Sequence, residues 1–278
     1  MSIVTIILIM VIGVVSGAYG MIVGAGGGFL FVPAILILFH LDPYVAAGTG
    51  LAVVFINSLS GVGGYMKQRR VDYSLGLTLS VGAIPGTFIG IKLAGQSSPQ
   101  AFYLIFAALL ISLGTFLFVK KAPIKEATSE VTEGVSAGIE NQNEVNQQFS
   151  GTLQRINAHR KKYLAIVLSG ILLGIVSSYF GIGGGWLLVP ILVYLFKVNP
   201  HEATATSIFS LAIYSTAGVL IHLLNQTIDW TIVLYGGIGV IIGGKIGVIL
   251  STKLSGDLKI RMLSIVLIAV GSKLLFEI

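Results

Sequence analysis

Two glycine clusters contain the backbone groups of this chain that are best placed to bind a ligand. The stretch GAGGGFLFVP runs from Gly24 to Pro33, and GIGGGWLLVP runs from Gly181 to Pro190. A helix that begins inside a membrane leaves backbone N–H groups without partners, and these groups can hold an anion with the help of the helix dipole. Glycine lets the ligand approach the backbone closely. The expected anion-binding groups belong to Gly26, Gly27, Gly28, Gly183, Gly184 and Gly185.

Hydroxyl and amide side chains follow each cluster and are suited to orienting an oxyanion. Ser207, Ser210 and Tyr214 fall at i, i+3 and i+7, which lie on one face of a helix. Lys245 lies inside its segment, where it either extends to the cytoplasmic side or places a positive charge near an anion path. The alternative for both sets is structural, with glycines that pack helices closely or break them and hydroxyls that bond between helices. The candidate side chains are Thr49, Asn57, Ser58, Thr206, Ser207, Ser210, Tyr214 and Lys245.

Enzymatic chemistry has no support in the acidic and thiol residues. The chain has 11 Asp and Glu residues and no cysteine. The acidic residues lie in a polar middle region or at the ends of apolar segments. No carboxylate pair, metal-ligand cluster or nucleophile with its base therefore lies at membrane depth. We expect no enzyme, no cofactor and no metal, and the short basic clusters in loops offer no face for a nucleic acid.

The elements that must position the candidate residues are membrane helices. Of the 278 residues, 55% are hydrophobic and 10% are charged, whereas soluble domains carry about 25% charged residues. The mean hydropathy is +0.94. We expect an all-α polytopic protein embedded in a lipid bilayer, which a helix crosses with about 20 apolar residues. The predicted segments lie near 2–22, 28–40, 45–65, 74–95, 100–119, 163–181, 185–197, 202–223, 231–252 and 258–276.

The two halves of the chain repeat at a constant offset of 157 residues. This predicts two five-segment repeats, in each of which the second segment is a short half-helix. The four-residue spacing of glycines in the fourth segment of each repeat is typical of close helix packing. Matched pairs include Pro33 with Pro190, Asp72 with Asp229, and Gly82, Gly86 and Gly90 with Gly239, Gly243 and Gly247.

The charges of the loops predict that the repeats are inverted. The KQRR loop of the first half contains Lys67, Arg69 and Arg70, whereas its counterpart from Leu224 to Asp229 has no basic residue. Basic loops stay in the cytoplasm, so matching loops face opposite sides of the membrane. If the short segments are re-entrant, each half has four crossings and the repeats become parallel instead.

The predicted organisation is a membrane repeat at 1–119, a polar linker at 120–162 and a second membrane repeat at 163–278. The linker is rich in Glu, Asn, Gln and Ser and is flanked by Lys and Arg. It has too little apolar surface to fold alone. We expect it in the cytoplasm, with both chain ends on the other side of the membrane.

Several of these motifs together resemble the TauE/SafE family of sulfite exporters. They are the paired glycine clusters, the short segments after them, the P-x-x-A at Pro43–Ala46 and Pro200–Ala203, and KQRRVD. The resemblance spans roughly 10–118 and 163–275. It implies an inner-membrane transporter of a bacterium or archaeon for sulfur-containing anions such as sulfite or organosulfonates. Related thiosulfate-uptake proteins work through thiols, which this chain lacks.

We therefore expect export of sulfite or an organosulfonate such as sulfoacetate by alternating access around a central site. The two half-helix N-termini would form that site. Alternatives are an anion channel with the same site, an importer of another small oxyanion or carboxylate, and a receptor or scaffold whose linker docks a partner. Nothing in the sequence indicates an oligomeric state.

Overall fold

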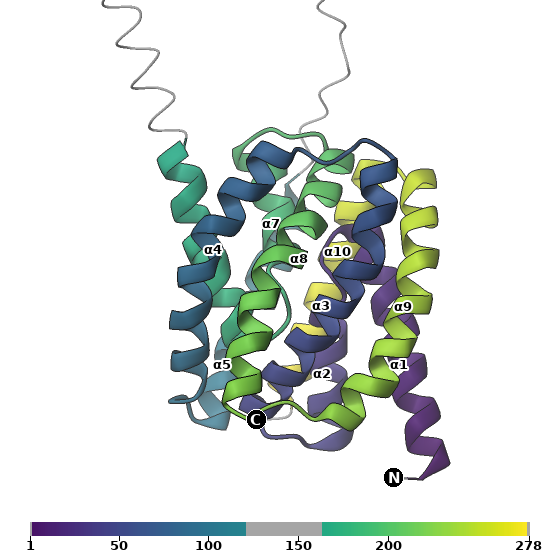
Figure 1. Cartoon of the computed structure of the whole chain (residues 1–278), viewed down its shortest axis with the longest axis vertical. Coiled ribbons are helices and arrows are strands. Elements are labelled where there is room, and N and C mark those ends of the chain that lie inside the picture. Colours follow the sequence, from purple (N-terminus) through teal and green to yellow (C-terminus); the bar gives the residue numbers. More distant parts are fainter. Residues whose placement is uncertain (1, 121–162, 277–278) are drawn as a thin grey trace, which may run out of the picture.

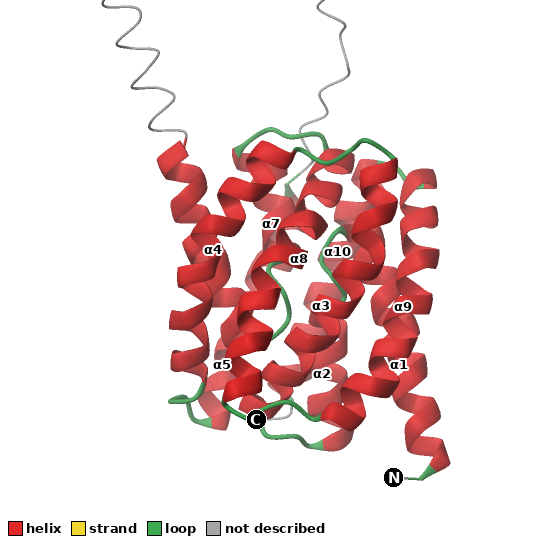
Figure 2. Ribbon diagram, viewed as in Figure 1, coloured by secondary structure: helices red, strands yellow, loops and turns green. Residues whose placement is uncertain are grey.

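The computed structural model describes residues 2–120 and 163–276, and this part of the chain is helical without a strand (Figure 2). Seven of its helices are long and apolar enough to cross a membrane by length and composition. The protein is thus an all-α polytopic membrane protein, and each predicted segment coincides with a helix. The predicted linker, apart from Lys120, lies outside the described residues.

The two halves contain the same series of long and short helices. The first half contains α1 (Ile3–Val23), α2 (Gly28–Phe39), α3 (Pro43–Lys67), α4 (Tyr73–Ala94) and α5 (Pro99–Val119). The second half contains the helix Tyr163–Phe180, α7 (Gly185–Pro190) continued by the π-helix η1 (Ile191–Leu195), α8 (Pro200–Leu224), α9 (Trp230–Lys253) and α10 (Gly256–Leu275). The elements predicted as half-helices are α2 and α7 with η1, which are indeed short.

Each half begins with a hairpin that returns to the face from which it started. Figure 1 shows both chain ends at one face of the bundle, here called the terminal face, and the ends that flank the linker at the other, the linker face. α1 rises from the terminal face and α2 returns to it, whereas Tyr163–Phe180 and α7 form a hairpin from the linker face. Three crossings follow in each half. The short helices are therefore returning arms, and hairpins that open to opposite faces support the inverted-repeat interpretation.

The acidic residues at the segment ends begin helices. Asp72 accepts a hydrogen bond from the backbone N–H of Leu75 at 3.0 Å, and Asp229 accepts one from that of Thr231 at 2.9 Å. Asp42 caps α3 in the same way, and a proline follows it in the first turn. Such caps satisfy backbone donors that the helix itself leaves free. These carboxylates therefore serve the ends of helices and not a site at membrane depth.

The glycine stripes pack helices of one half against helices of the other. A methyl group built at Gly82 of α4 would lie 2.5 Å from the carbonyl oxygen of Val167 in the helix Tyr163–Phe180. In the matched interface, one built at Gly13 of α1 would lie 2.6 Å from the carbonyl oxygen of Gly236 in α9. Only residues without side chains allow backbones to approach so closely. The predicted packing role of the stripes is confirmed.

Enlarging a stripe glycine should separate two helices that now touch. We expect Gly86→Leu to destabilise the protein by about 2 kcal/mol or more, because its side chain would overlap the carbonyl oxygen of Ile171. The midpoint of thermal unfolding in detergent measures this. Gly63→Leu is the matched control, since nothing lies within 4 Å of a methyl group built at Gly63. Equal midpoints for the two variants would contradict the prediction.

Candidate functional site

Both half-helices begin inside the bundle, after turns that require glycine. Gly26 and Gly27 have φ angles of +76° and +85°, and Gly183 has +70°, values that side chains strongly disfavour. In the first turn, the carbonyl oxygen of Gly20 accepts hydrogen bonds from the N–H groups of Ala25 at 2.8 Å and Gly26 at 3.2 Å. This folds the chain back along α1. Figure 2 shows both turns as loops within the bundle, away from either face.

The two turns touch at the centre of the molecule. A methyl group at Gly28 would overlap the carbonyl oxygen of Ile182, and one at Gly185 would overlap that of Gly24. Residue 185 is the counterpart of residue 28 at the offset of 157. The structure thus brings together the two predicted glycine clusters, with α2 and α7 starting side by side and running to opposite faces (Figure 1).

The first N–H groups of both half-helices have no hydrogen-bond partners in the described chain. The carbonyl oxygen of Gly27 accepts from the N–H groups of Leu30 and Phe31, both at 3.1 Å, so intrahelical bonding begins there. Within residues 2–120 and 163–276, the N–H groups of Gly28 and Phe29 make no hydrogen bond. The same holds in the described chain for Trp186 and the glycine before it. Unbonded donors at two helix starts are what an anion site requires.

Asn57 and Tyr214 occupy matched positions and hold the two turns. Asn57 Nδ2 donates to the carbonyl oxygen of Gly26 at 2.9 Å, and the N–H of Gly184 donates to Tyr214 Oη at 2.7 Å. Both side chains are buried. Asn57 Oδ1 and the buried Trp186 Nε1 have no partner among the residues described. A buried polar atom without a partner costs about 1–3 kcal/mol, so these atoms mark a place where a ligand or water would add stability.

Two aliphatic side chains close the space between the turns. Val54 Cγ1 would lie 2.7 Å from a methyl group at Gly183 and 3.2 Å from one at Gly26. Leu211 Cδ1 would lie 3.0 Å from a methyl group at Gly183, and its other methyl group overlaps the same space at Gly26. Val54 and Leu211 are also one offset of 157 apart. The sequence does not distinguish this pair from others at the same offset, because matched aliphatic residues are common in such a chain.

Thr49 and Thr206 do not reach this centre. Thr49 Oγ1 accepts a hydrogen bond from the N–H of Asp229 at 2.9 Å, at the terminal face. Thr206 Oγ1 accepts one from the N–H of Asp72 at 3.0 Å, at the linker face. Each hydroxyl therefore ties a connection of one half to a helix of the other. Their described role is structural.

The remaining candidates lie at varied distances from the turns. Ser58 donates to the carbonyl oxygen of Val54 at 2.8 Å within its own helix, and Ser207 donates to that of Gly24 at 2.8 Å. Ser210 points to α4, where it donates to the carbonyl oxygen of Gly76 at 3.1 Å. The three α8 side chains predicted to share one face therefore have separate partners. Ser207 and Tyr214 contact the glycine turns, whereas Ser210 contacts α4.

Lys245 points away from the candidate site. It is exposed on α9, whereas the adjacent Gly244 faces Asn57 and Ser60. A methyl group at Gly244 would lie 2.5 Å from Asn57 Oδ1 and 2.9 Å from Ser60 Oγ. Of the two interpretations of Lys245, this placement favours a side chain that extends along the outside of the bundle.

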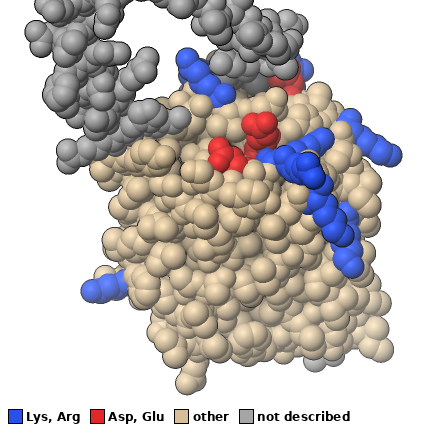
Figure 3. Space-filling model, turned by 45° about the horizontal axis from the view of Figure 1, so that its top comes forward, with Lys and Arg blue, Asp and Glu red and all other residues tan. Residues whose placement is uncertain are grey.

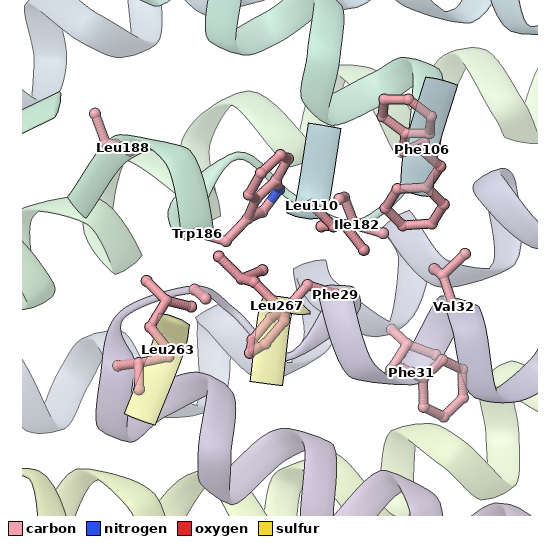
Figure 4. Close-up of a cluster of buried hydrophobic side chains, with 14 of the residues drawn as sticks. Phe29, Phe31, Val32, Phe106, Leu110, Ile182, Trp186, Leu188, Leu263 and Leu267 are labelled. Carbon is pink, nitrogen blue, oxygen red and sulfur yellow. The ribbon is translucent and has the colours of Figure 1, made fainter. Parts of the chain in front are cut away.

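The first turns of the half-helices are embedded in an apolar cluster. The cluster seals the site from the lipid on the side of α5 and α10, and it contains the aromatic residue that follows each glycine cluster. A dry surrounding strengthens electrostatic interactions with backbone donors. Figure 4 shows Phe29 and Trp186 with Phe106 and Leu110 of α5 and Leu263 and Leu267 of α10.

Basic side chains gather at the linker face. Figure 3 shows Lys and Arg residues around this face above a wall with few charges. By position in the fold, the terminal face carries only Lys92 and Lys273 among the described basic residues. In the part of the chain that the structure describes, no group of three His, Asp or Glu side chains is placed to hold a metal. The described basic residues of the linker face are Lys67, Arg69, Arg70, Lys120, Lys197, Lys253, Lys259 and Arg261.

Comparison with known proteins places this architecture among transporters. The family model "Sulfite exporter TauE/SafE" matches residues 9–274. The "Probable membrane transporter protein YunE" of Bacillus subtilis (strain 168) is 30% identical over 281 residues, which cover 98% of this chain and 97% of that protein. A "Probable membrane transporter protein" of Methanocaldococcus jannaschii is 25% identical over 279 residues, with coverage of 95% and 93%. No solved structure matches the chain. The chain is a membrane transporter of the sulfite exporter TauE/SafE family.

Proposed function

We propose that the protein exports a small sulfur-containing anion, either sulfite or an organosulfonate such as sulfoacetate. The observation that carries the proposal is the meeting of two half-helix starts whose first N–H groups have no partners in the described chain. Two positive dipole ends at one point favour a negative ligand. The family name adds the chemical class, since it refers to sulfite.

The proposed site combines backbone and side-chain groups. The N–H groups of Gly28 and Phe29 from α2 and of Gly185 and Trp186 from α7 would bind the oxygens of the anion. Asn57, Ser207 and Tyr214, which hold the turns, would set the distance between the two sets of donors. Sulfur oxyanions present several acceptor oxygens to such donors, and charge-assisted hydrogen bonds are the strong ones.

Alternating access would require Val54 and Leu211 to move. They close the centre in the conformation described, on α3 of one half and α8 of the other. A relative movement of these two crossing helices would open the centre to one face at a time, as in other transporters with inverted repeats. Closed packing at the centre favours a carrier over an open pore.

The distribution of charge favours export as the direction of transport. Basic residues concentrate at the linker face, so we place that face in the cytoplasm and the chain in the inner membrane of a prokaryotic cell. The membrane potential is negative inside. Expelling an anion therefore gains about 2.3 kcal/mol per charge per 100 mV, and export needs no carboxylate relay.

Flux measurements in liposomes test the proposal directly. Purified protein should give saturable flux of sulfite or sulfoacetate above that of protein-free vesicles, with slower movement of sulfate and thiosulfate. Electrical recording of the same vesicles separates the alternatives, because large unitary currents would identify a channel. The absence of flux for every anion in the panel would overturn the proposal.

Filling the space before α7 should remove the binding site. Gly184 has an ordinary φ of −79°, and a methyl group there would lie 2.6 Å from Tyr214 Oη, the end of a side chain that can move. We expect Gly184→Leu to remain folded and to lose sulfite binding by roughly tenfold or more. Thermal stabilisation by sulfite measures this, with Gly63→Leu as the control. Unchanged sulfite stabilisation in Gly184→Leu would contradict the assignment.

Shortening Leu211 should loosen the closed centre. We expect Leu211→Ala to raise the flux of sulfoacetate relative to sulfite, because the larger anion gains most from the added space. The variant should also lose about 2–5 kcal/mol of stability, as buried Leu→Ala changes do. Leu211→Ile keeps the volume and serves as the control. Lower stability with an unchanged flux ratio would show that Leu211 only packs.

A further inference from the structure

A buried lysine at the linker face has no carboxylate partner among the described residues. Lys259, in the first turn of α10, is 3% exposed. Its Nζ donates to Ser251 Oγ at 2.8 Å and lies 3.1 Å from His201 Nδ1, which accepts when the neutral ring carries its proton on Nε2. Neither partner neutralises the charge. A buried cation is costly unless an opposite charge compensates it.

A second cation, Arg70, lies at the same face as Lys259. Arg70 lies in the connection from α3 to α4, and the hydrogen bond from the N–H of Asp72 to Thr206 Oγ1 ties this connection to α8, the helix that carries His201. Arg70 Nη1 is buried and has no hydrogen-bond partner within the described ranges. Two like charges together make the lack of a counter-charge more costly. We call Lys259, Arg70 and His201 the basic cluster.

The three described carboxylates of the linker face do not neutralise the basic cluster. Asp72 caps α4, and Asp257 is exposed to solvent. Glu202 is exposed on the first turn of α8. None of the three carboxylates forms an ion pair with Lys259 in the described structure. Within residues 2–120 and 163–276 the basic cluster is therefore a positive site without a counter-charge, which an oxyanion would complete.

Hydrogen bonds connect the basic cluster to the first glycine turn. Ser251 Oγ, which accepts from Lys259, donates to the carbonyl oxygen of Ile22 at 3.5 Å. Tyr65 Oη donates to the carbonyl oxygen of Met21 at 2.5 Å. These carbonyl groups end α1 directly before the turn that begins at Gly24. The basic cluster therefore lies beside the route from the linker face to the centre.

The opposite face has no equivalent charges. At the offset of 157, Lys259 corresponds to Phe102, Arg70 to Thr227 and His201 to Tyr44. Phe102 is buried among aromatic rings, stacked 5.7 Å from Tyr179 between centroids. The basic cluster is thus an addition to one end of a repeated framework. Packing of the repeats does not demand it, since the other end packs with neutral side chains.

We propose that Lys259, Arg70 and His201 form a second oxyanion-binding site, at which the substrate is captured from the linker face before it reaches the half-helix site. The capture of a transported anion rests on the proposed function, whereas binding of an oxyanion at the cluster does not. Ser251 and His201 contact Lys259 Nζ in the conformation described. The incoming anion would supply the missing counter-charge as this face opens.

Binding is tested with sulfite on the full chain in nanodiscs of zwitterionic lipid. Sulfite should raise the midpoint of thermal unfolding of the wild type, relative to the same concentration of chloride. In Lys259→Met we expect the sulfite concentration at half-effect to rise roughly tenfold. Lys253→Met, an exposed lysine at the same face, should respond like the wild type. Lys259→Arg, which keeps the charge, should retain most of the response.

A purely structural role for Lys259 gives a different result. It would lower the midpoint of Lys259→Met without ligand and leave the sulfite response intact, and this overturns the proposal. Arg70→Gln, at a half-buried position, repeats the test if Lys259→Met does not fold. Stabilisation of the wild type by phosphatidylglycerol but not by sulfite would identify a lipid headgroup as the oxyanion and also overturn substrate capture.

Flux separates this proposal from the proposed function. With sulfite supplied at the linker face of liposomes, Lys259→Met should have a raised KM, whereas sulfite supplied at the terminal face should give the wild-type KM. The capture site is overturned if Lys259→Met has the flux of the wild type and the same KM for sulfite at both faces. If Lys259→Met loses the sulfite response while the wild type shows no flux, the result supports the binding site and refutes transport.

Discussion

Backbone polar groups inside a bilayer have no water to bond, and the centre of this protein is built around that constraint. Most groups of the two turns are satisfied locally, by the carbonyl oxygen of Gly20, by Asn57 and by Tyr214. The donors that remain without partners in the described chain lie at the two half-helix starts. The glycine stripes and the apolar cluster hold helices around these starts and exclude lipid. A transported anion would satisfy the last donors only while it is at the centre.

The sequence predicts the helices well, because a membrane-length apolar run has few other structures available. The paired glycine clusters also predict the two central turns, since positive φ angles and close contacts select glycine strongly. The positions of Thr49 and Thr206 could not be predicted in this way. An offset identifies equivalent residues, but it does not say which of them meet in space. Val54 and Leu211 meet at the glycine turns, whereas the two threonines lie at opposite faces.

The two halves share a framework but differ in charge. Asn57 and Tyr214 do similar work at matched positions with different groups, one donating to a turn and the other accepting from it. At the two faces the difference is larger, because Lys259 has Phe102 as its counterpart. A symmetric framework permits movement in either direction, and side chains that differ between the halves can bias it. For an anion, the position of positive charge is the strongest bias available.

At each face of the bundle, a threonine of one half accepts a hydrogen bond from the other half. Thr206 joins the connection before α4 to α8 at the linker face, and Thr49 joins the connection before α9 to α3 at the terminal face. Each is a single neutral hydrogen bond, worth about 1 kcal/mol. In the proposed alternating access, opening one face would break only the threonine hydrogen bond of that face, while the other bond would hold the far face closed. Opening both faces at once would break both hydrogen bonds and would therefore cost more than opening either face alone. Simultaneous opening would let ions leak down the membrane potential.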